Sequence, residues 1–248
     1  MDFTFLKDYS QFFINGTKIT IIISLFTLIL GFMIGTIICL GKISRNKLLS
    51  ILSSAYIEFL RGTPLLVQIY IIYFGLPTIG IEFPDVAFIP SEYIAAIFAL
   101  SINSSAYIAE ILRSGIQSID KGQMEASRSL GLDYSMSMRM IIIPQALKNV
   151  LPALANEFIV LVKESSIVSI IGIQDLMYSS DIVRGNTYLA FEPLIVAAMI
   201  YFVLTFSLSK LVSSFENKLQ IKSSGKSSKA KNKLNASKIA ERGELWYK

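Results

Sequence analysis

The stretch of sequence that decides the fold is ITIIISLFTLILGFMIGTIICLG, residues 19–41, in which 23 consecutive residues carry no charge. A helix of about 20 apolar residues crosses the roughly 30 Å hydrocarbon core of a bilayer, so this stretch predicts a membrane span. Residues 144–163 are interrupted by Lys148 and Glu157, but Lys148 lies near one end, where its side chain extends to the membrane surface. Three further windows are free of charge over at least 17 residues: 62–81, 93–109 and 193–209. The sequence therefore predicts an all-α polytopic membrane protein with five transmembrane helices.

The composition also indicates a chain that is solvated by lipid. Of the 248 residues, 53% are hydrophobic and 17% are charged, whereas a soluble domain carries about 25% charged residues. The sequence has no histidine, and Cys39 is its one cysteine. Histidine-based catalysis, zinc sites built from cysteine and histidine, and internal disulfides are therefore excluded, and we expect neither a catalytic residue nor a metal site.

The number of lysine and arginine residues alternates between low and high in the successive segments outside the predicted spans. Residues 1–18 carry two of them, 42–61 four, 82–92 none, 110–148 five, 163–192 two and the tail from Lys210 ten. Positively charged loops stay on the cytoplasmic side of a membrane, so the alternation predicts an N-terminus outside the cell and a cytoplasmic C-terminus. The net charge of +5 is thus explained by topology, and we expect no nucleic-acid partner.

The two ends of the chain lie outside the predicted spans. Residues 1–18 carry aromatic and apolar side chains at helical spacing, and we interpret them as a short helix in the outer interface or as loose aromatic anchors. These side chains are Phe5, Leu6, Tyr9, Phe12 and Phe13. Residues 220–248 are rich in lysine and serine and predict a disordered, basic cytoplasmic tail. We favour a solvated tail over one that binds anionic lipid.

A long loop, residues 110–143, lies between the third and fourth predicted spans. Loops of this length usually have a function of their own. Residues 122–130 predict a short helix that ends at Gly131, and a second helical stretch runs towards Pro144, which is expected to start the next helix. Two short helices outside the membrane form a protruding knob. Its apolar side chains predict a protein partner: Met124, Leu130 and Leu132.

The loop carries an ordered set of residues: Glu125, Ala126, Ser127, Gly131, Ile141, Ile143 and Pro144. Their order and spacing resemble the EAA loop of bacterial ABC-importer permeases, which reads E-A-A, three residues, G, nine residues and I-x-L-P. Ser127 replaces the third alanine and Ile143 the leucine, and both are small steric changes. The flanking stretches RGTPLLVQ (61–68) and NSSAYIAE (103–110) are similar to permeases for polar amino acids. The resemblance extends over about residues 16–219.

The resemblance implies the membrane-spanning subunit of an ATP-driven importer of polar amino acids in the bacterial plasma membrane, working by alternating access. Residues 1–18 would be an extracytoplasmic segment and 19–219 the permease domain. The implied partners are an ATP-binding subunit, a second permease subunit, an extracytoplasmic amino-acid-binding protein and membrane lipid. The resemblance assigns coupling to Glu125, Ala126, Ser127, Leu130, Gly131 and Pro144. A carboxylate at Glu125 in the first helical turn suits the helix dipole, and Gly131 allows the chain to reverse.

ATP and Mg²⁺ are expected on the partner subunits, with no cofactor and no enzyme activity in this chain. The Gly-Lys-Ser at residues 225–227 is not a nucleotide-binding loop, because Gln220 stands where that loop has its leading glycine.

Polar groups within the spans are candidates to bind the substrate, because such groups are costly in a membrane. The carboxylate of Glu157 would meet an ammonium group, and the carboxylate of an amino acid would meet Lys163 or helix-end N–H groups. The alternative is that Glu157 forms an ion pair with Lys163. Asn103 and Ser104 either hydrogen-bond the substrate or join helices to one another.

Several other features have packing explanations. Gly31 and Gly35 form a G-x-x-x-G pair that permits close helix approach. Pro64 is expected to kink a helix that starts near residue 48 and continues through the second span. Residues 165–174 are too short to span and predict a re-entrant or interfacial helix on the outer side.

Two functions of other classes remain as alternatives. An intramembrane enzyme would need a reactive set of side chains, but the spans offer one carboxylate and no histidine. A secondary transporter that works without ATP more often shows an internal repeat and needs no docking knob. Neither alternative accounts for residues 110–143. The identity of the amino acid stays open between glutamine, glutamate, cystine and the basic amino acids.

Overall fold

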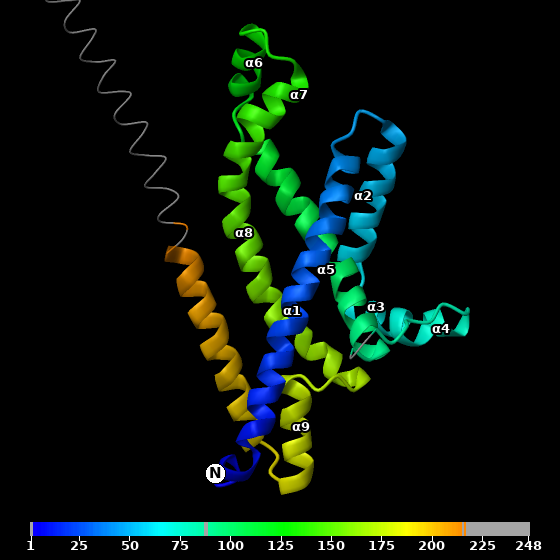
Figure 1. Ribbon diagram of the computed structural model, residues 1–248, viewed down its shortest axis with the longest axis vertical. Helices are drawn as coiled ribbons and strands as arrows, with labels where there is room; N and C mark the ends of the chain where they lie inside the picture. The colour runs from blue at the N-terminus through cyan, green and yellow to red at the C-terminus, as the bar shows by residue number, and fades with distance from the viewer. Residues whose placement is uncertain (1, 87–88, 215, 217–248) are drawn as a thin grey trace, which may run out of the picture.

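The computed structural model describes residues 2–86, 89–214 and 216, and this part of the chain is built from helices (Figure 1). Its one β-feature is an isolated bridge between Val86 and Ile89. The helices are α1 (Leu6–Lys42), α2 (Lys47–Gly62), α3 (Leu65–Tyr70), α4 (Leu76–Thr78), α5 (Ser91–Gln117), α6 (Lys121–Ser129), α7 (Tyr134–Ser137), α8 (Ile143–Glu164), α9 (Leu176–Thr187) and a last helix, Glu192–Ser214. The predicted all-α class is confirmed, and residues 220–248 lie outside the described part.

Three of the helices are each long and apolar enough to cross a membrane: α1, α5 and Glu192–Ser214. They contain the predicted spans 19–41, 93–109 and 193–209. A fourth candidate is α2 taken together with Leu65–Thr78, which are bent by 106°. The segment predicted at 144–163 forms α8, which is not one of these candidates. The structure thus supports three or four spans on length and composition.

The first predicted span begins much earlier than its charge-free stretch. α1 is one helix of 37 residues, so no turn separates residues 6–18 from the span. Phe5 and Phe13 are 6% and 3% exposed and pack with Leu176, Val183 and Ala197. The interpretation of these two aromatic side chains as interface anchors is therefore wrong, because they bury their rings within the protein.

The second predicted span, 62–81, is not a straight helix. α2 ends at Gly62, and Thr63 is extended, with φ −116° and ψ 144°, because the ring of Pro64 disfavours the helical conformation in the residue before it. Figure 1 shows α3 and α4 running across the direction of α2. The amide of Gln68 stabilises the break by donating to the Leu60 carbonyl at 2.8 Å. A kink was predicted at Pro64, and the structure has a complete break.

α1 and α5 cross in close contact at the predicted pair of glycines. A Cβ at Gly35 would lie 2.8 Å from the carbonyl oxygen of Ser105, and one at Gly31 would lie 3.4 Å from that of Ser101. Contact between backbones at this distance requires glycine. The main apolar core lies beside this crossing and unites α1, α3 and α5 with the segment after α8: Ile23, Ile69, Ile72, Ala96, Ala99, Leu100, Val168, Ile171 and Ile173.

The segment after α8 is more structured than the sequence predicted. A 3-10 helix, Ser165–Ile171, ends at Gly172 with φ +88° and agrees with the predicted short helix. α9 follows and was missed. Its N-cap is Asp175, whose Oδ1 accepts from the Tyr178 N–H at 2.8 Å. An aspartate before an apolar pair is a helix-start signal that the sequence did contain.

Candidate functional site

A buried carboxylate lies between α5 and α8. Glu157 of α8 is 8% exposed, and its Oε1 accepts a hydrogen bond from the Ser104 hydroxyl of α5 at 3.0 Å. The two helices also approach at Gly115, where a Cβ would lie 2.2 Å from Val150. Two of the side chains predicted to bind substrate are therefore brought together.

Lys163 is not part of this cluster. It is exposed and lies six positions after Glu157, so the two side chains emerge from different faces of α8. The ion pairs of the described residues do not include Glu157. The alternative that Glu157 pairs with Lys163 is therefore wrong, and the predicted contact of Lys163 with the substrate has no support in this geometry.

Asn103 joins helices. It is 5% exposed, and its amide donates to the side-chain oxygen of Gln68 at 2.9 Å. Gln68 in turn holds the end of α2 through the Leu60 carbonyl. This chain of hydrogen bonds links α5 to the break after α2 and supports the helix-joining alternative for Asn103. Gln68 was missed by the sequence analysis, although an amide inside an apolar window is itself a signal.

A positive charge lies where the end of α2 contacts α5. Arg61 is exposed in the last turn of α2, and its guanidinium carbon is 5.4 Å from the centroid of the Tyr107 ring of α5. That distance is typical of a cation–π contact. Sequence analysis missed this pair, because nothing in the spacing of residues 61 and 107 indicates that they meet.

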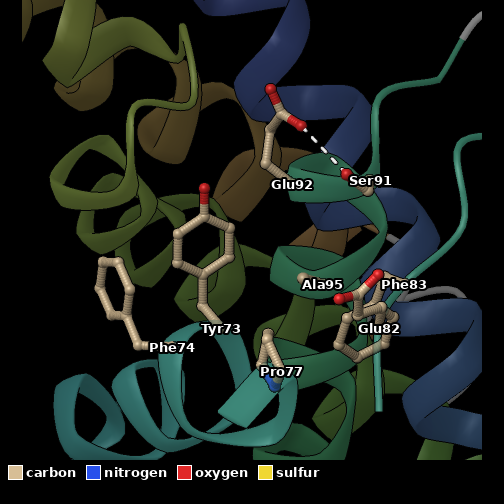
Figure 2. Close-up of a pocket in the computed structure, with 8 residues that line it drawn as sticks. All are labelled: Tyr73, Phe74, Pro77, Glu82, Phe83, Ser91, Glu92 and Ala95. Atoms are coloured by element: carbon tan, nitrogen blue, oxygen red, sulfur yellow. Dashed lines mark hydrogen bonds between the residues drawn. The ribbon is translucent and has the colours of Figure 1, made fainter. Parts of the chain in front are cut away.

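A pocket lies at the start of α5, and Figure 2 shows its lining. Its volume is about 400 Å³, with Tyr73 and Phe74 on one side and Glu82 on the other. The Ser91 hydroxyl lies 3.4 Å from the carboxylate of the next residue, Glu92. Aromatic rings and carboxylates together favour a cationic group over an anionic one. The pocket is on the side of the molecule where the sequence predicts the outer surface.

The predicted knob is present: α6 and α7 lie at the end of the molecule opposite α9 (Figure 1). α6 starts at Asp120, whose Oδ1 accepts from the Gly122 N–H at 2.7 Å. Two hydrogen bonds from the chain beyond α6 close its C-terminal end: the Gly131 N–H donates to the Arg128 carbonyl at 3.0 Å, and the Leu132 N–H donates to the Ser127 carbonyl at 3.2 Å. Gly131 has φ +86°, a conformation that favours glycine. The predicted helix end at Gly131 is confirmed.

The residues of the EAA pattern do not share one environment. Glu125 and Ala126 are exposed, whereas Ser127 is buried and its hydroxyl donates to the Met124 carbonyl at 2.8 Å. Leu130 is 82% exposed. Glu125 lies in the second turn of α6, so the prediction that it complements the dipole in the first turn is wrong. The Asp120 cap does so instead.

Pro144 does not start a new helix. Asp133 caps α7, and a π-helical stretch, Met138–Ile142, joins α7 to α8 without a turn. The Ile143 N–H donates to the Met138 carbonyl five residues earlier. Such a widened turn accommodates a proline that has no N–H to donate. The knob is thus continuous with the helix that carries Glu157.

The same end of the molecule carries a set of ionic and cation–π contacts. Glu110 of α5 binds Lys42 at 2.5 Å and Arg113 at 2.7 Å, which ties the end of α1 to α5. The guanidinium carbon of Arg45 lies 5.6 Å from the Tyr134 ring centroid. These contacts connect the knob and α5 with the α1–α2 connection.

Comparison with known proteins agrees with this arrangement. Residues 27–221 match the family described as binding-protein-dependent transport system inner membrane component. The chain is 42% identical over 209 residues to "Putative glutamine transport system permease protein GlnP" of Rickettsia bellii, which covers 84% of this chain and 93% of that protein. It is 40% identical over 220 residues to "Arginine transport system permease protein ArtQ" of Bacillus subtilis, covering 89% of this chain and 98% of that one.

A solved structure is also similar. It is described as the crystal structure of an amino acid ABC transporter with histidines, and one of its chains superposes with a TM-score of 0.82 at 49% sequence identity. The match covers 88% of this chain and 99% of that chain. Sequence and fold therefore point to the same group of proteins.

Proposed function

The chain belongs to the family of binding-protein-dependent transport system inner membrane components, and we propose that it forms the translocation path of an ATP-driven importer of polar amino acids. The observation that carries the proposal is the buried carboxylate of Glu157 on a helix that continues into an exposed knob. Substrate binding and coupling to ATP hydrolysis would thus both act on one continuous helix, which runs from α7 through α8.

The proposal includes five membrane crossings. α8 supplies the fifth crossing beside α1, α2 with its bent continuation, α5 and Glu192–Ser214. It is less apolar than the others because it carries Lys148, Glu157 and Lys163. A helix that lines a polar path does not need a wholly apolar surface. The alternation of lysine and arginine then predicts a knob in the cytoplasm of a bacterial cell and an N-terminus outside, and the pattern persists when Arg61, at the end of α2, is left out of the count for residues 42–61.

Glu157 and Ser104 are the proposed substrate contacts. A carboxylate inside a membrane costs about 2.5 kcal/mol or more unless it is paired. The described residues offer it one hydroxyl and no cation. An ammonium group of the transported amino acid supplies the missing charge, and the Ser104 hydroxyl orients the carboxylate towards it.

The knob is the proposed docking surface for an ATP-binding subunit. Glu125, Ala126 and Leu130 form its exposed part, while Ser127, Gly131 and Pro144 shape it. When the ATP-binding subunits close, the knob moves with α8 and switches the path between inward-open and outward-open states. ATP and Mg²⁺ act on those partner subunits. A second permease subunit completes the path, and an extracytoplasmic binding protein delivers the amino acid near the outer pocket.

The test is ATP-dependent uptake by the complex reconstituted with its ATP-binding subunit and binding protein in vesicles. A panel of labelled polar amino acids is offered with and without ATP. The proposal expects accumulation of at least one of them only with ATP. Uptake that persists without ATP and without the ATP-binding subunit would establish the secondary transporter instead.

A further inference from the structure

Arg61 places a positive charge near the middle of the membrane. Its partner Tyr107 lies 16 residues after the start of α5 and ten residues before its end, which is about 24 Å and 15 Å along the helix axis. α5 is one of the candidate spans. The guanidinium therefore lies at the depth of the hydrocarbon core.

The surroundings of Arg61 do not neutralise this charge. The ion pairs of the described residues do not include Arg61, although Glu58 lies one turn earlier in α2. Both side chains are exposed on the surface of the chain. An arginine that faces lipid at this depth costs about 2.5 kcal/mol or more, so this surface of α2 faces water or protein. The carbonyl end of α2 and the Tyr107 ring stabilise the cation without supplying an anion.

The charge of Arg61 is close to the proposed substrate contacts. Tyr107 and Ser104 are three residues apart on α5, and such neighbours have Cβ atoms about 5–6 Å apart. The Ser104 hydroxyl donates a hydrogen bond to Glu157, and the Tyr107 ring makes the cation–π contact with Arg61. Two α5 residues about one turn apart, Ser104 and Tyr107, thus contact a carboxylate from α8 and a guanidinium from α2. An amino acid carries the two complementary charges.

We infer that Arg61 binds the α-carboxylate of the transported amino acid, while Tyr107 positions the guanidinium. The inference rests on the proposed function and replaces Lys163, which is exposed on another face of α8. A guanidinium binds a carboxylate through two parallel N–H donors. The Tyr107 ring contacts the guanidinium on its face, which leaves the N–H groups at its edge available to the substrate.

The test uses the complex of permease and ATP-binding subunits without the binding protein. The probe is tritiated L-arginine or L-glutamine, whichever the wild-type complex imports, displaced by the unlabelled amino acid or by its α-amide. The amide keeps the ammonium group and lacks the carboxylate. In the wild-type complex the amide should bind about tenfold to 100-fold more weakly than the amino acid.

The Arg61→Gln variant should lose this discrimination, so that the amino acid and its amide bind within about twofold of each other. Arg61→Lys should restore part of it, because a lysine keeps the charge and loses the paired donors. Two matched controls should discriminate like the wild type. Arg45→Gln removes another arginine that stacks on a tyrosine, and Glu58→Gln removes the carboxylate nearest Arg61 along α2.

Three results would overturn the inference. Unchanged discrimination in Arg61→Gln shows that the carboxylate binds elsewhere, and the proposed function stands. Dissociation of the permease dimer in Arg61→Gln with unchanged discrimination shows that Arg61 pairs with the second subunit. A wild-type complex that imports no polar amino acid removes the proposed function and this site with it.

Discussion

The buried centre of the molecule and its protruding knob each have a side chain in an unusual environment: a charged one is buried in the centre, and a large apolar one is exposed on the knob. Glu157 in the centre is 8% exposed, and Leu130 on the knob is 82% exposed. Carboxylates are rarely buried without a cation. A group of exposed large apolar side chains often marks a contact, and besides Leu130 the knob and its junction with α8 expose Tyr134, Met136 and Met140. Each region therefore lacks a partner of different chemistry: a small cation for Glu157 and a protein for Leu130.

The two regions are joined by one helical rod. Tyr134 and Glu157 are 23 residues apart in the continuous run of α7, the π-helical stretch and α8, a length of about 35 Å. Under the proposed function, a displacement of the knob would move the carboxylate with it. Under the proposed function, coupling would depend on the shape of the knob, whereas selectivity would depend on the charge in the centre. Variants of the two regions separate these two properties.

The largest effect is expected from Gly131→Val. A β-branched residue at φ +86° costs about 1–3 kcal/mol, and both hydrogen bonds that close the C-terminal end of α6 would be distorted. ATP-dependent uptake should fall by about tenfold or more, with a normal amount of protein in the membrane. Gly131→Asn is the control, because asparagine tolerates this conformation. Wild-type uptake by the valine variant would show that the shape of the knob is irrelevant to coupling.

The next effect is expected from Glu157→Ala. Loss of the carboxylate should reduce substrate-stimulated ATPase activity by about tenfold, because the ammonium group loses a charge-assisted hydrogen bond. Ser104→Ala should reduce it by a smaller factor, since only the orienting hydroxyl is lost. Both variants should retain basal ATPase activity, which requires an intact knob. Unchanged stimulation and apparent affinity in Glu157→Ala would remove this carboxylate from the path.

A smaller effect is expected from Leu130→Ala. Truncation of a side chain that anchors a protein interface costs more than about 1 kcal/mol. Binding of the ATP-binding subunit to permease-containing vesicles should weaken accordingly, while amino-acid binding should not change. Leu211→Ala is the matched control, because Leu211 is 59% exposed on the last helix and away from the knob. Equal docking of the two variants would contradict the role of Leu130.

The smallest effect is expected at Asp175, which is remote from both regions. Burial raises the pKa of this N-cap carboxyl to about 6 from 3.8. The folded state therefore binds the proton more tightly than the unfolded state, so its contribution to stability is present at low pH and is lost as the pH rises from about 4 to about 6. Asp175→Asn keeps the cap and should flatten this part of the profile of thermal stability against pH. Uptake should not change, and an unaltered profile would contradict the assignment.

The features that could be predicted are those encoded locally. Charge-free windows located three spans, and the residues around Gly131 predicted the end of α6, because a left-handed turn needs glycine. The same loop predicted the family, which the relatives confirm. At the site, Glu157 and Ser104 were named and do meet, since each is polar within an apolar window.

The features that were missed depend on contacts distant in sequence. The Gln68–Asn103 hydrogen bond and the Arg61–Tyr107 contact join residues that share no pattern. The complete break at Pro64 is held by the Gln68 side chain, and the smooth passage through Pro144 depends on a π-helical turn. Pro64 was predicted to kink a helix and Pro144 to start one, and the structure differs from both predictions. The outcome at each proline was set by neighbouring groups that the local sequence does not specify.

The central claim is that the knob is a cytoplasmic surface covered by an ATP-binding subunit. The most direct measurement introduces Leu130→Cys or Phe191→Cys into a Cys39→Ser background and labels intact cells with a membrane-impermeant maleimide. Leu130, directly after α6, is 82% exposed, and Phe191, between α9 and the last helix, is 72% exposed. Figure 1 shows α6 and α9 at opposite ends of the molecule. We predict that the Phe191→Cys variant is labelled in intact cells, and that Leu130→Cys is labelled only in opened membranes stripped of the ATP-binding subunit. Labelling of Leu130→Cys from outside intact cells would contradict the account.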